Sequence, residues 1–146
     1  MNNDTVAGFF LKDWYVFDNF APFQIDWRGK LYSTAEHAYQ AAHFLNTEPE
    51  LAEKVRACRS PRNASDFANE HSDQDDPGWK EKRLSIREEI VRAKLEQHPL
   101  VRSTLTESSE LYIVEMNDED EFWGWGKSHD GQNNLGKIWM KLRSEI

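Results

Sequence analysis

Near the start of the chain, residues 33–45 have hydrophobic and polar positions at helical spacing. One side consists of small or aromatic residues three or four positions apart: Ala35, Ala38, Tyr39 and Ala42. Ser33 or Thr34 can cap the first turn, and Ser33 with Glu36 has the S-x-x-E spacing of a capping box. The pattern predicts a helix that begins at these residues.

Five further segments carry helical patterns or helix-end signals. They are 48–58, 60–69, 77–97, 100–105 and 133–146. Ser60 followed by Pro61 is typical of a helix start, and Pro99 ends the long apolar pattern of the third segment. Asn133 or Asn134 is expected to cap the last helix.

Short strands are predicted in two parts of the chain. Residues 8–32 are rich in aromatic side chains and are interrupted by turn residues, so brief strands are expected there. Segments 24–27 and 30–32 suit a hairpin around Arg28-Gly29. Residues 111–116, LYIVEM, have the clearest strand pattern in the chain.

Length and composition fit one folded domain. The chain has 146 residues, of which 38% are apolar and 12% aromatic, so it can bury a core. Strands and helices do not alternate as βαβ units, and the sequence has no dinucleotide-binding or P-loop glycine motif. We therefore predict an α+β fold: a single compact, helix-rich domain with a few short strands, spanning residues 1–146.

Charge and cysteine content narrow the class of protein. A net charge of −8 without a Lys/Arg run argues against duplex nucleic acid as the main partner. The single Cys58 rules out a disulfide framework within the chain and fits a reducing compartment. The sequence has no leader pattern and no run of about 18 apolar residues, so a cytoplasmic protein is expected. No metal site is expected, and the oligomeric state is not indicated.

A row of chemically capable side chains lies beside the packed face of the first predicted helix. Glu36, Gln40 and His43 follow one another at i, i+4 and i+7, which brings a carboxylate, an amide and an imidazole to one side. Glu36 and His43 also have a structural interpretation, since Glu36 could serve as a helix cap and His43 could lie at the surface or at the edge of the core. The segment alone leaves both interpretations open.

The segment 120–136, DEFWGWGKSHDGQNNLG, has the most unusual composition. Glycines beside Trp123 and Trp125 let the backbone approach a ligand or a neighbouring element, and the indoles offer flat faces to a base. Asp120 could bind ribose hydroxyls or act as a second carboxylate, and the helix start at Asn133-Asn134 would direct N–H groups toward a phosphate. A tight turn with packed tryptophans and an Asn cap explains the same residues equally well.

Taken together, these features predict a cleft with Glu36 on one wall, tryptophans on another, and Lys94 or arginines toward a phosphate. Such groups suit cleavage of a bond between a base-like group and ribose. A carboxylate can stabilise an oxocarbenium-like centre or activate water. A lysine could instead form an imine with the opened sugar. Composition and spacing do not choose between these routes.

Five separated blocks of sequence resemble the YbiA-like NADAR family and cover nearly the whole chain. They are 19–20, 32–41, 93–97, Asp120 with 123–126, and 133–138 with Met140 and Arg143. The resemblance implies an α+β N-glycosidase domain without metal or cofactor. Its members are linked to hydrolysis of phosphoribosylated aminopyrimidine intermediates of riboflavin synthesis, and others to removal of ADP-ribose from modified guanine.

The resemblance also implies roles for individual residues. By motif, Glu36 is the catalytic carboxylate, Lys94 an amine near the ribose, and Asp120 a ribose or water ligand with a catalytic part. The expected substrate contacts are Asn19, Phe20, Gln40, Trp79, Trp123, Gly124, Trp125, Gly126, Asn133 and Asn134. The expected partner is a small ribosylated base or ADP-ribosylated guanine.

Three departures from the family pattern change the charge near the expected phosphate. The family usually has Ser where this chain has Asp18, and Lys where it has His43 and Gln132. These changes motivate an alternative function, a non-catalytic module that binds ADP-ribose or a related nucleotide. A third possibility is an interaction protein whose aromatic surface docks a partner chain.

Overall fold

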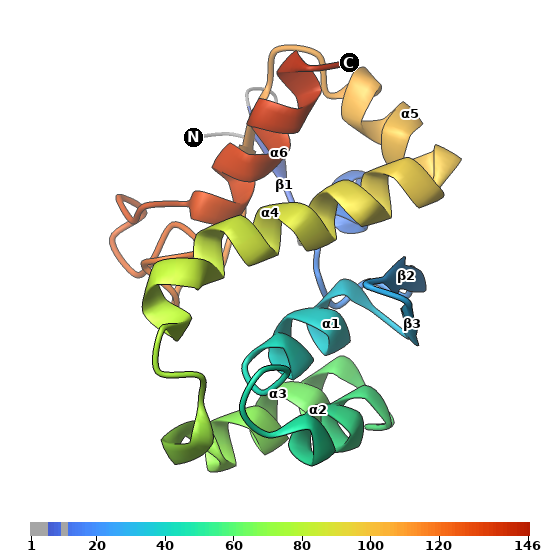
Figure 1. Cartoon of the computed structure of the whole chain (residues 1–146). Helices are drawn as coiled ribbons and strands as arrows, with labels where there is room; N and C mark the ends of the chain where they lie inside the picture. The colour runs from blue at the N-terminus through green and yellow to red at the C-terminus, as the bar shows by residue number, and fades with distance from the viewer. Residues whose placement is uncertain (1–5, 10–11) are drawn as a thin grey trace. The chain divides into compact units, whose positions relative to one another are not determined.

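The computed structural model describes residues 6–9 and 12–146 (Figure 1). Residues 1–5, part of the segment in which no leader was expected, and residues 10–11 of the predicted strand region lie outside this description. The described chain separates into two compact units. One unit contains the described residues up to Ala21 together with His98–Ile146, and the other contains Pro22–Gln97.

The first unit joins the two ends of the chain through a two-stranded parallel sheet. Strand β1 (Val6–Gly8) pairs with β4 (Tyr112–Val114), with Val6 opposite Tyr112. Helix α6 (Asn134–Ser144) packs against β4, and α5 (Pro99–Glu107) packs against η1 (Lys12–Phe17). Strand β4 is shorter than the predicted 111–116, and α5 is longer than the predicted 100–105.

The segment η1 is a 3-10 helix, where brief strands were predicted. That prediction was wrong because aromatic composition was taken as a strand signal. In a 3-10 helix, residues three apart lie above one another, and Trp14 and Phe17 accordingly stack with 6.2 Å between ring centroids. Phe17 also packs on Trp139, whose indole Nε1 donates to the Phe17 carbonyl over 3.1 Å. Tertiary packing therefore stabilises this turn as a helix.

The second unit begins with the predicted hairpin, formed by β2 (Ile25–Trp27) and β3 (Lys30–Tyr32). Arg28 and Gly29 between the strands have φ values of 50° and 81°, the geometry of a tight I′ turn. Four helices follow, with a short 3-10 turn, η2, between the third and fourth. They are α1 (Ala35–Ala42), α2 (Pro49–Arg56), α3 (Pro61–Glu70) and α4 (Trp79–Gln97), with η2 at Ser72–Gln74.

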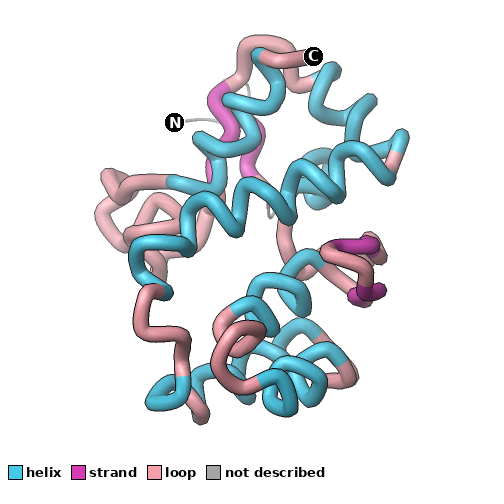
Figure 2. Tube along the Cα trace, viewed as in Figure 1, coloured by secondary structure: helices cyan, strands magenta, loops and turns pink. Residues whose placement is uncertain are grey.

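Helix α1 is the central element of this unit. All of its residues are buried, and it packs against α2, α3 and α4. In Figures 1 and 2, α1, α2 and α3 lie together as a small group of helices. The predicted small-residue face of α1 is confirmed, and its polar side chains are enclosed as well. The polar residues of α1 must therefore find partners inside the unit.

The start of α1 differs from the capping box that the sequence suggested. Thr34, with extended backbone, is the N-cap, and its hydroxyl accepts the His37 N–H over 3.1 Å. A capping box on Thr34 would need Glu or Gln at position 37, where the chain has His37. The Ser33–Glu36 box is therefore absent, and the Glu36 side chain has partners elsewhere.

His37 ties this helix start to the loop that precedes α3. Its Nε2 lies 2.9 Å from the Cys58 carbonyl, and its Nδ1 lies 2.8 Å from the Thr34 hydroxyl. Because a carbonyl only accepts, Nε2 carries the proton and the Thr34 hydroxyl donates to Nδ1. His37 is fully buried, so this histidine has a structural role.

Helix α4 begins where Asp76 gathers three donors. Its carboxylate accepts from Lys82, from the Gly78 N–H over 2.8 Å, and from the Asn46 amide. These contacts, with Lys82 foremost, lower the pKa of Asp76 to about 2.

None of the helices in the described part of the chain is long and apolar enough to cross a membrane.

Candidate functional site

Glu36 receives a hydrogen bond on each of its carboxylate oxygens. Gln40, one turn further along α1, donates from Nε2 to Oε1 over 2.6 Å. Arg87, from α4, donates from Nη1 to Oε2 over 3.3 Å. The pairing of Glu36 and Gln40 follows from their i, i+4 spacing, as the sequence indicated. Both oxygens of Glu36 therefore act as acceptors in this arrangement.

Arg87 is held in place by an aromatic ring as well as by Glu36. Its guanidinium carbon lies 3.4 Å from the centroid of the Tyr39 ring, a close cation–π contact. Glu36, Tyr39, Gln40 and Arg87 are all at least nine-tenths buried. The carboxylate therefore sits in a confined polar cluster, where charges interact more strongly than in water.

His43, the third member of the predicted row, faces a different set of groups. Its Nδ1 lies 3.0 Å from Asp75, and its ring stacks on Trp79 with 4.0 Å between centroids. Burial lowers the pKa of His43, although Asp75 opposes this effect. Tyr39 packs against both rings, with 5.2 Å to Trp79. One face of Trp79 is thus covered by His43, which restricts the predicted contact between Trp79 and a substrate.

Lys94 lies on the same face of α4 as Arg87, seven residues further along. Its side chain is fully buried, and its Nζ lies 5.1 Å from the centroid of the Phe23 ring. A fully buried lysine is uncommon and is found where it is paired or functional. Its role as an amine near ribose stays a prediction.

Arg87 is the neighbour of Glu36 that the sequence did not single out. The sequence showed that Arg87 and Lys94 share a face of the long helix, which was the available signal. It did not show that this face meets α1. That contact depends on packing between helices, which local patterns do not encode.

The first unit holds the Trp-Gly segment (residues 120–136), and Asp120 organises its start. Asp120 Oδ1 accepts the N–H groups of Phe122 and Trp123 over 2.9 and 2.7 Å, respectively. Trp123 is buried, whereas the Trp125 indole donates to Asp118 and stacks on His129 with 3.8 Å between centroids. These contacts give Asp120 a structural task within its loop. Its predicted part in catalysis is a separate proposal.

The glycines of this segment let the chain approach itself closely. A Cβ on Gly124 would lie 2.8 Å from the Glu115 carbonyl oxygen, and one on Gly136 would lie 2.1 Å from the Ile113 carbonyl oxygen. Gly126 has a φ of 70°, which favours glycine. Of the two uses of glycine left open by the sequence, close packing on a neighbouring element is the one seen here.

Asn133 binds the main chain with both ends of its amide. Its Oδ1 accepts the Glu115 N–H and its Nδ2 donates to the Ile113 carbonyl, over 3.0 and 2.9 Å. The N–H groups of Asn134 and Leu135 donate to the carbonyls of residues 122 and 123. The phosphate site predicted at this helix start therefore has its first N–H groups already occupied. The structure gives Asn133 a structural role.

Two other predicted substrate contacts lie near the end of the first segment of this unit. Asn19 is buried, and its Oδ1 has no hydrogen-bond partner among the described residues. Phe20 is 42% exposed, and its N–H donates to the Asp18 carboxylate over 2.9 Å. Asp18, one of the departures from the family pattern, thus closes a local turn. Gln132 likewise makes a local bond, accepting from the Asn134 amide over 3.2 Å.

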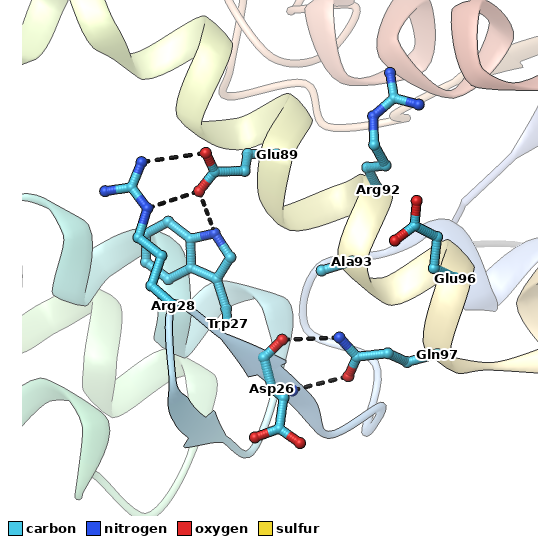
Figure 3. A pocket seen from close by; sticks show the side chains of 8 residues that line it. All are labelled: Asp26, Trp27, Arg28, Glu89, Arg92, Ala93, Glu96 and Gln97. Carbon is cyan, nitrogen blue, oxygen red and sulfur yellow. Dashed lines mark hydrogen bonds and ion pairs between the residues drawn. The ribbon is translucent and has the colours of Figure 1, made fainter.

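The second unit also has an open pocket of about 400 Å³ between the hairpin and α4 (Figure 3). Its lining residues are Asp26, Trp27, Arg28, Glu89, Arg92, Ala93, Glu96 and Gln97. The Glu89 carboxylate accepts hydrogen bonds from Trp27 Nε1 and from Arg28. The Gln97 side-chain amide accepts the Asp26 N–H with its oxygen and donates to the Asp26 carbonyl with its nitrogen. Glu89 is two residues past Arg87, and Glu96 is two residues past Lys94. Both glutamates therefore lie on the opposite side of the helix from Arg87 and Lys94. This pocket is therefore separate from the cluster around Glu36.

The structure brings the predicted site residues together in two groups. One contains Glu36, Gln40 and Trp79, with Lys94 on the same helix as Arg87. The other unit contains the rest, which are Asn19, Phe20, Asp120, residues 123–126, Asn133 and Asn134. A single hollow that holds both groups stays a prediction. Within the described residues, no group of three or more His, Cys, Asp or Glu side chains could hold a metal ion.

Comparison with known proteins places the chain in a family. The model of the NADAR domain matches residues 3–146. The chain belongs to the NADAR domain family. The resemblance seen in the five sequence blocks is thus confirmed.

Members of this family resemble the chain over most of its length. N-glycosidase YbiA of Escherichia coli is 32% identical over 145 residues, 98% of this chain and 89% of that protein. N-glycosidase Npun_R5314 of Nostoc punctiforme is 30% identical over 94% of this chain and 91% of its own length. The chloroplastic riboflavin biosynthesis protein PYRR of Zea mays is 27% identical over 94% of this chain, but this match covers 25% of the maize protein.

The NMR structure of E. coli YbiA also matches this NADAR chain. The TM-score is 0.86 at 31% identity, and the match covers 99% of this chain and 86% of the other. The helix-rich α+β fold predicted from sequence is confirmed by this match and by the six α-helices of the described residues.

Proposed function

We propose that this NADAR-domain chain is an N-glycosidase, which hydrolyses the bond between a base-like group and ribose. The observation that carries the proposal is the match to N-glycosidase YbiA, at 32% identity over 98% of this chain and 89% of that protein. The buried carboxylate of Glu36 supplies a group suited to this chemistry. The protein acts on a small ribosylated molecule.

Glu36 acts in this reaction as a hydrogen-bond acceptor and negative charge. Both of its oxygens already accept hydrogen bonds, from Gln40 and Arg87, and each keeps a second lone pair for a substrate group or water. A carboxylate held this way can stabilise positive charge that develops at the anomeric carbon, or accept a proton from the attacking water. Because its environment is formed before substrate binds, little reorganisation is needed during the reaction.

Two further roles are part of the proposal, one for Lys94 in the second unit and one for the Trp-Gly segment in the first unit. The fully buried Lys94 amine acts near the ribose, and the indoles of Trp123 and Trp125 contact the base. Asp120 holds the N–H groups of Phe122 and Trp123, and so positions Trp123 for that contact. An imine between Lys94 and the opened sugar is the alternative to direct attack by water.

The proposed substrate class is a phosphoribosylated aminopyrimidine of riboflavin synthesis. The relative that supports this choice is the maize protein named for riboflavin biosynthesis, and its matching segment covers 94% of this chain. ADP-ribosylated guanine is the second substrate to test, since it also presents a base, a ribose and a phosphate. A cytoplasmic location is part of the proposal and rests on the single cysteine.

The deciding experiment measures release of free base from both substrates by the wild-type chain, by Glu36→Gln and by Glu96→Gln. Glu36→Gln keeps the shape of the side chain but removes its charge, and we expect turnover to fall by about 1,000-fold. Glu96 is exposed on the opposite side of α4, so the matched Glu96→Gln variant should keep wild-type turnover.

Two outcomes would contradict the proposal. Equal base release by the wild-type chain and Glu36→Gln would remove Glu36 from catalysis. Tight binding of ADP-ribose by calorimetry, without turnover of either substrate, would favour the non-catalytic binding module instead.

A further inference from the structure

The amide of Gln40 can have only one orientation beside Glu36. Its Nε2 donates to Glu36 Oε1 over 2.6 Å. Turning the amide by half a rotation would place its carbonyl oxygen at that distance from a carboxylate oxygen, and two acceptors repel each other. The carboxylate therefore directs the Gln40 carbonyl oxygen away from itself.

The oxygen oriented in this way has no hydrogen-bond partner among residues 6–9 and 12–146. Gln40 is only 7% exposed, and its Oε1 is buried. This oxygen makes no hydrogen bond to any described residue. Buried polar atoms without a hydrogen-bond partner are rare, because each one lowers the stability of the folded state. Gln40 Oε1 lies next to the candidate catalytic carboxylate, so it is a candidate acceptor for a donor group of the ligand.

The chemistry of that donor is constrained by its position. A carbonyl oxygen only accepts, so the ligand group must be a hydroxyl or an N–H. In the proposed function Glu36 faces the anomeric carbon, where positive charge develops. The donor nearest to that carbon on the sugar is the hydroxyl of the adjacent carbon, the 2′-hydroxyl. Gln40 is tied directly to Glu36, so its carbonyl lies one group away from the reacting centre.

We propose that Gln40 Oε1 accepts a hydrogen bond from the 2′-hydroxyl of the substrate and so selects ribosyl over 2′-deoxyribosyl compounds. This inference rests on the proposed function. A hydrogen bond to the hydroxyl beside the anomeric carbon strengthens as charge develops there, so its loss lowers the rate of the chemical step. A substrate without this hydroxyl leaves the buried carbonyl unpaired, which is the basis of strong discrimination.

The test compares ribosyl and 2′-deoxyribosyl forms of one substrate in wild type, in Gln40→Met and in Gln74→Met. Met matches the length of Gln but has neither amide group, and Gln74 is an exposed control in η2. We expect the ribosyl to 2′-deoxyribosyl ratio of kcat/KM to fall by about 10- to 100-fold in Gln40→Met and to stay unchanged in Gln74→Met. Each ratio is compared between variants, so the intrinsic reactivity of the two sugars cancels.

The ratio also separates reading of the hydroxyl from positioning of Glu36. Loss of the Gln40 N–H weakens the hold on Glu36 for both substrates equally, so a purely positioning role lowers both values of kcat/KM and leaves the ratio unchanged. That result overturns the inference while the proposed function stands. If Gln40→Met does not fold, as judged by circular dichroism, Gln40→Leu takes its place.

If the wild-type chain cleaves neither form, the proposed function fails and binding decides the inference. Calorimetry then compares ribose 5-phosphate with 2-deoxyribose 5-phosphate, using the wild-type chain and Gln40→Met. A preference for the ribose compound that disappears in Gln40→Met supports the contact with the hydroxyl. Equal affinities in the wild-type chain, or no binding of either compound, overturn it.

Discussion

Arg87 Nη1 lies 3.3 Å from Glu36 Oε2, although 51 positions separate the two residues in the chain. Their side chains are only 4% and 8% exposed. An ion pair at such depth is expensive to break, since removal of one partner leaves a buried charge uncompensated. The geometry of the candidate catalytic carboxylate is therefore coupled to the packing of α1 on α4.

The first prediction concerns this ion pair. Arg87→Met should lower the free energy of unfolding by about 3 kcal/mol, because Glu36 is left buried without its cation. Arg87→Lys should have a smaller effect on stability, since it keeps the charge but loses the planar contact with Tyr39. Urea denaturation measures both values, and kcat for base release should fall in both variants.

A surface ion pair provides the control for Arg87→Met. Arg62 pairs with Asp66, and these side chains are 78% and 53% exposed. Arg62→Met should therefore change stability by less than about 1 kcal/mol. If Arg87→Met and Arg62→Met lower the free energy of unfolding by the same amount, the buried ion pair does not contribute more to stability than the surface pair.

The second prediction concerns the start of α1. Thr34→Ala should lower the free energy of unfolding by about 2 kcal/mol, because the His37 N–H loses its acceptor and the buried His37 Nδ1 loses its donor. Ser33→Ala should be nearly neutral, since Ser33 is exposed and the capping box suggested by sequence is absent. Thermal unfolding followed by circular dichroism compares the two. A larger loss in Ser33→Ala would mean that Ser33 caps the helix in solution.

The third prediction is a pH dependence that comes from His43. Burial lowers its pKa in the folded chain, against the opposing effect of Asp75, while an unfolded histidine has a pKa of 6.5. Below that value the unfolded chain binds a proton that the folded chain resists. The free energy of unfolding should therefore fall as the pH drops through 6.5, and level off below the folded pKa.

Denaturation by urea between about pH 5 and 8 measures this slope. The groups that act electrostatically on His43 are Asp75, Arg87 and Glu36, and none of them is changed in His43→Gln. That variant should show a smaller loss of stability on acidification than the wild-type chain. His129→Gln changes a histidine whose side chain is 52% exposed, and should keep the wild-type slope. A wild-type slope in His43→Gln would contradict the assignment.

The fourth prediction concerns the junction of β4 and α6. A Cβ at Gly136 would lie 2.1 Å from the Ile113 carbonyl oxygen and 2.4 Å from the Asn133 amide. Gly136→Ala should therefore destabilise the chain by about 3 kcal/mol through overpacking against main chain. At Gly78 the nearest atom is the flexible end of Lys82, at 3.4 Å, so Gly78→Ala should be tolerated. Equal stability of the two variants, measured in urea, would argue against this close contact.

Much of the secondary structure was predictable because its signals are local. Ser60 caps α3 through the Asn63 N–H, with Pro61 in its first turn, as the sequence indicated. The hairpin turn at Arg28-Gly29 and the end of α4 before Pro99 also follow from neighbouring residues. The bond between Gln40 and Glu36 belongs to the same class, since one helical turn brings the two side chains together.

One misassigned helix and one strand pairing that was not predicted depend on contacts between distant segments. The helix η1 is stabilised where Phe17 packs on Trp139, a residue of α6. Pairing of β1 with β4 joins residues near both ends of the chain, such as Val6 and Tyr112. Neither contact leaves a periodic pattern within its own segment, so sequence reading could not find it.

The amino-acid sequence by itself determined the family of this protein, most of its helix boundaries and the neighbouring pair Glu36 and Gln40, because spacing and capping act over a few residues. Only the tertiary structure decided which cation meets Glu36, which hydroxyl caps α1 and which amide oxygen has no donor within the described part of the chain. Those outcomes depend on how helix faces pack against one another. Packing brings together residues from distant positions whose local patterns are independent.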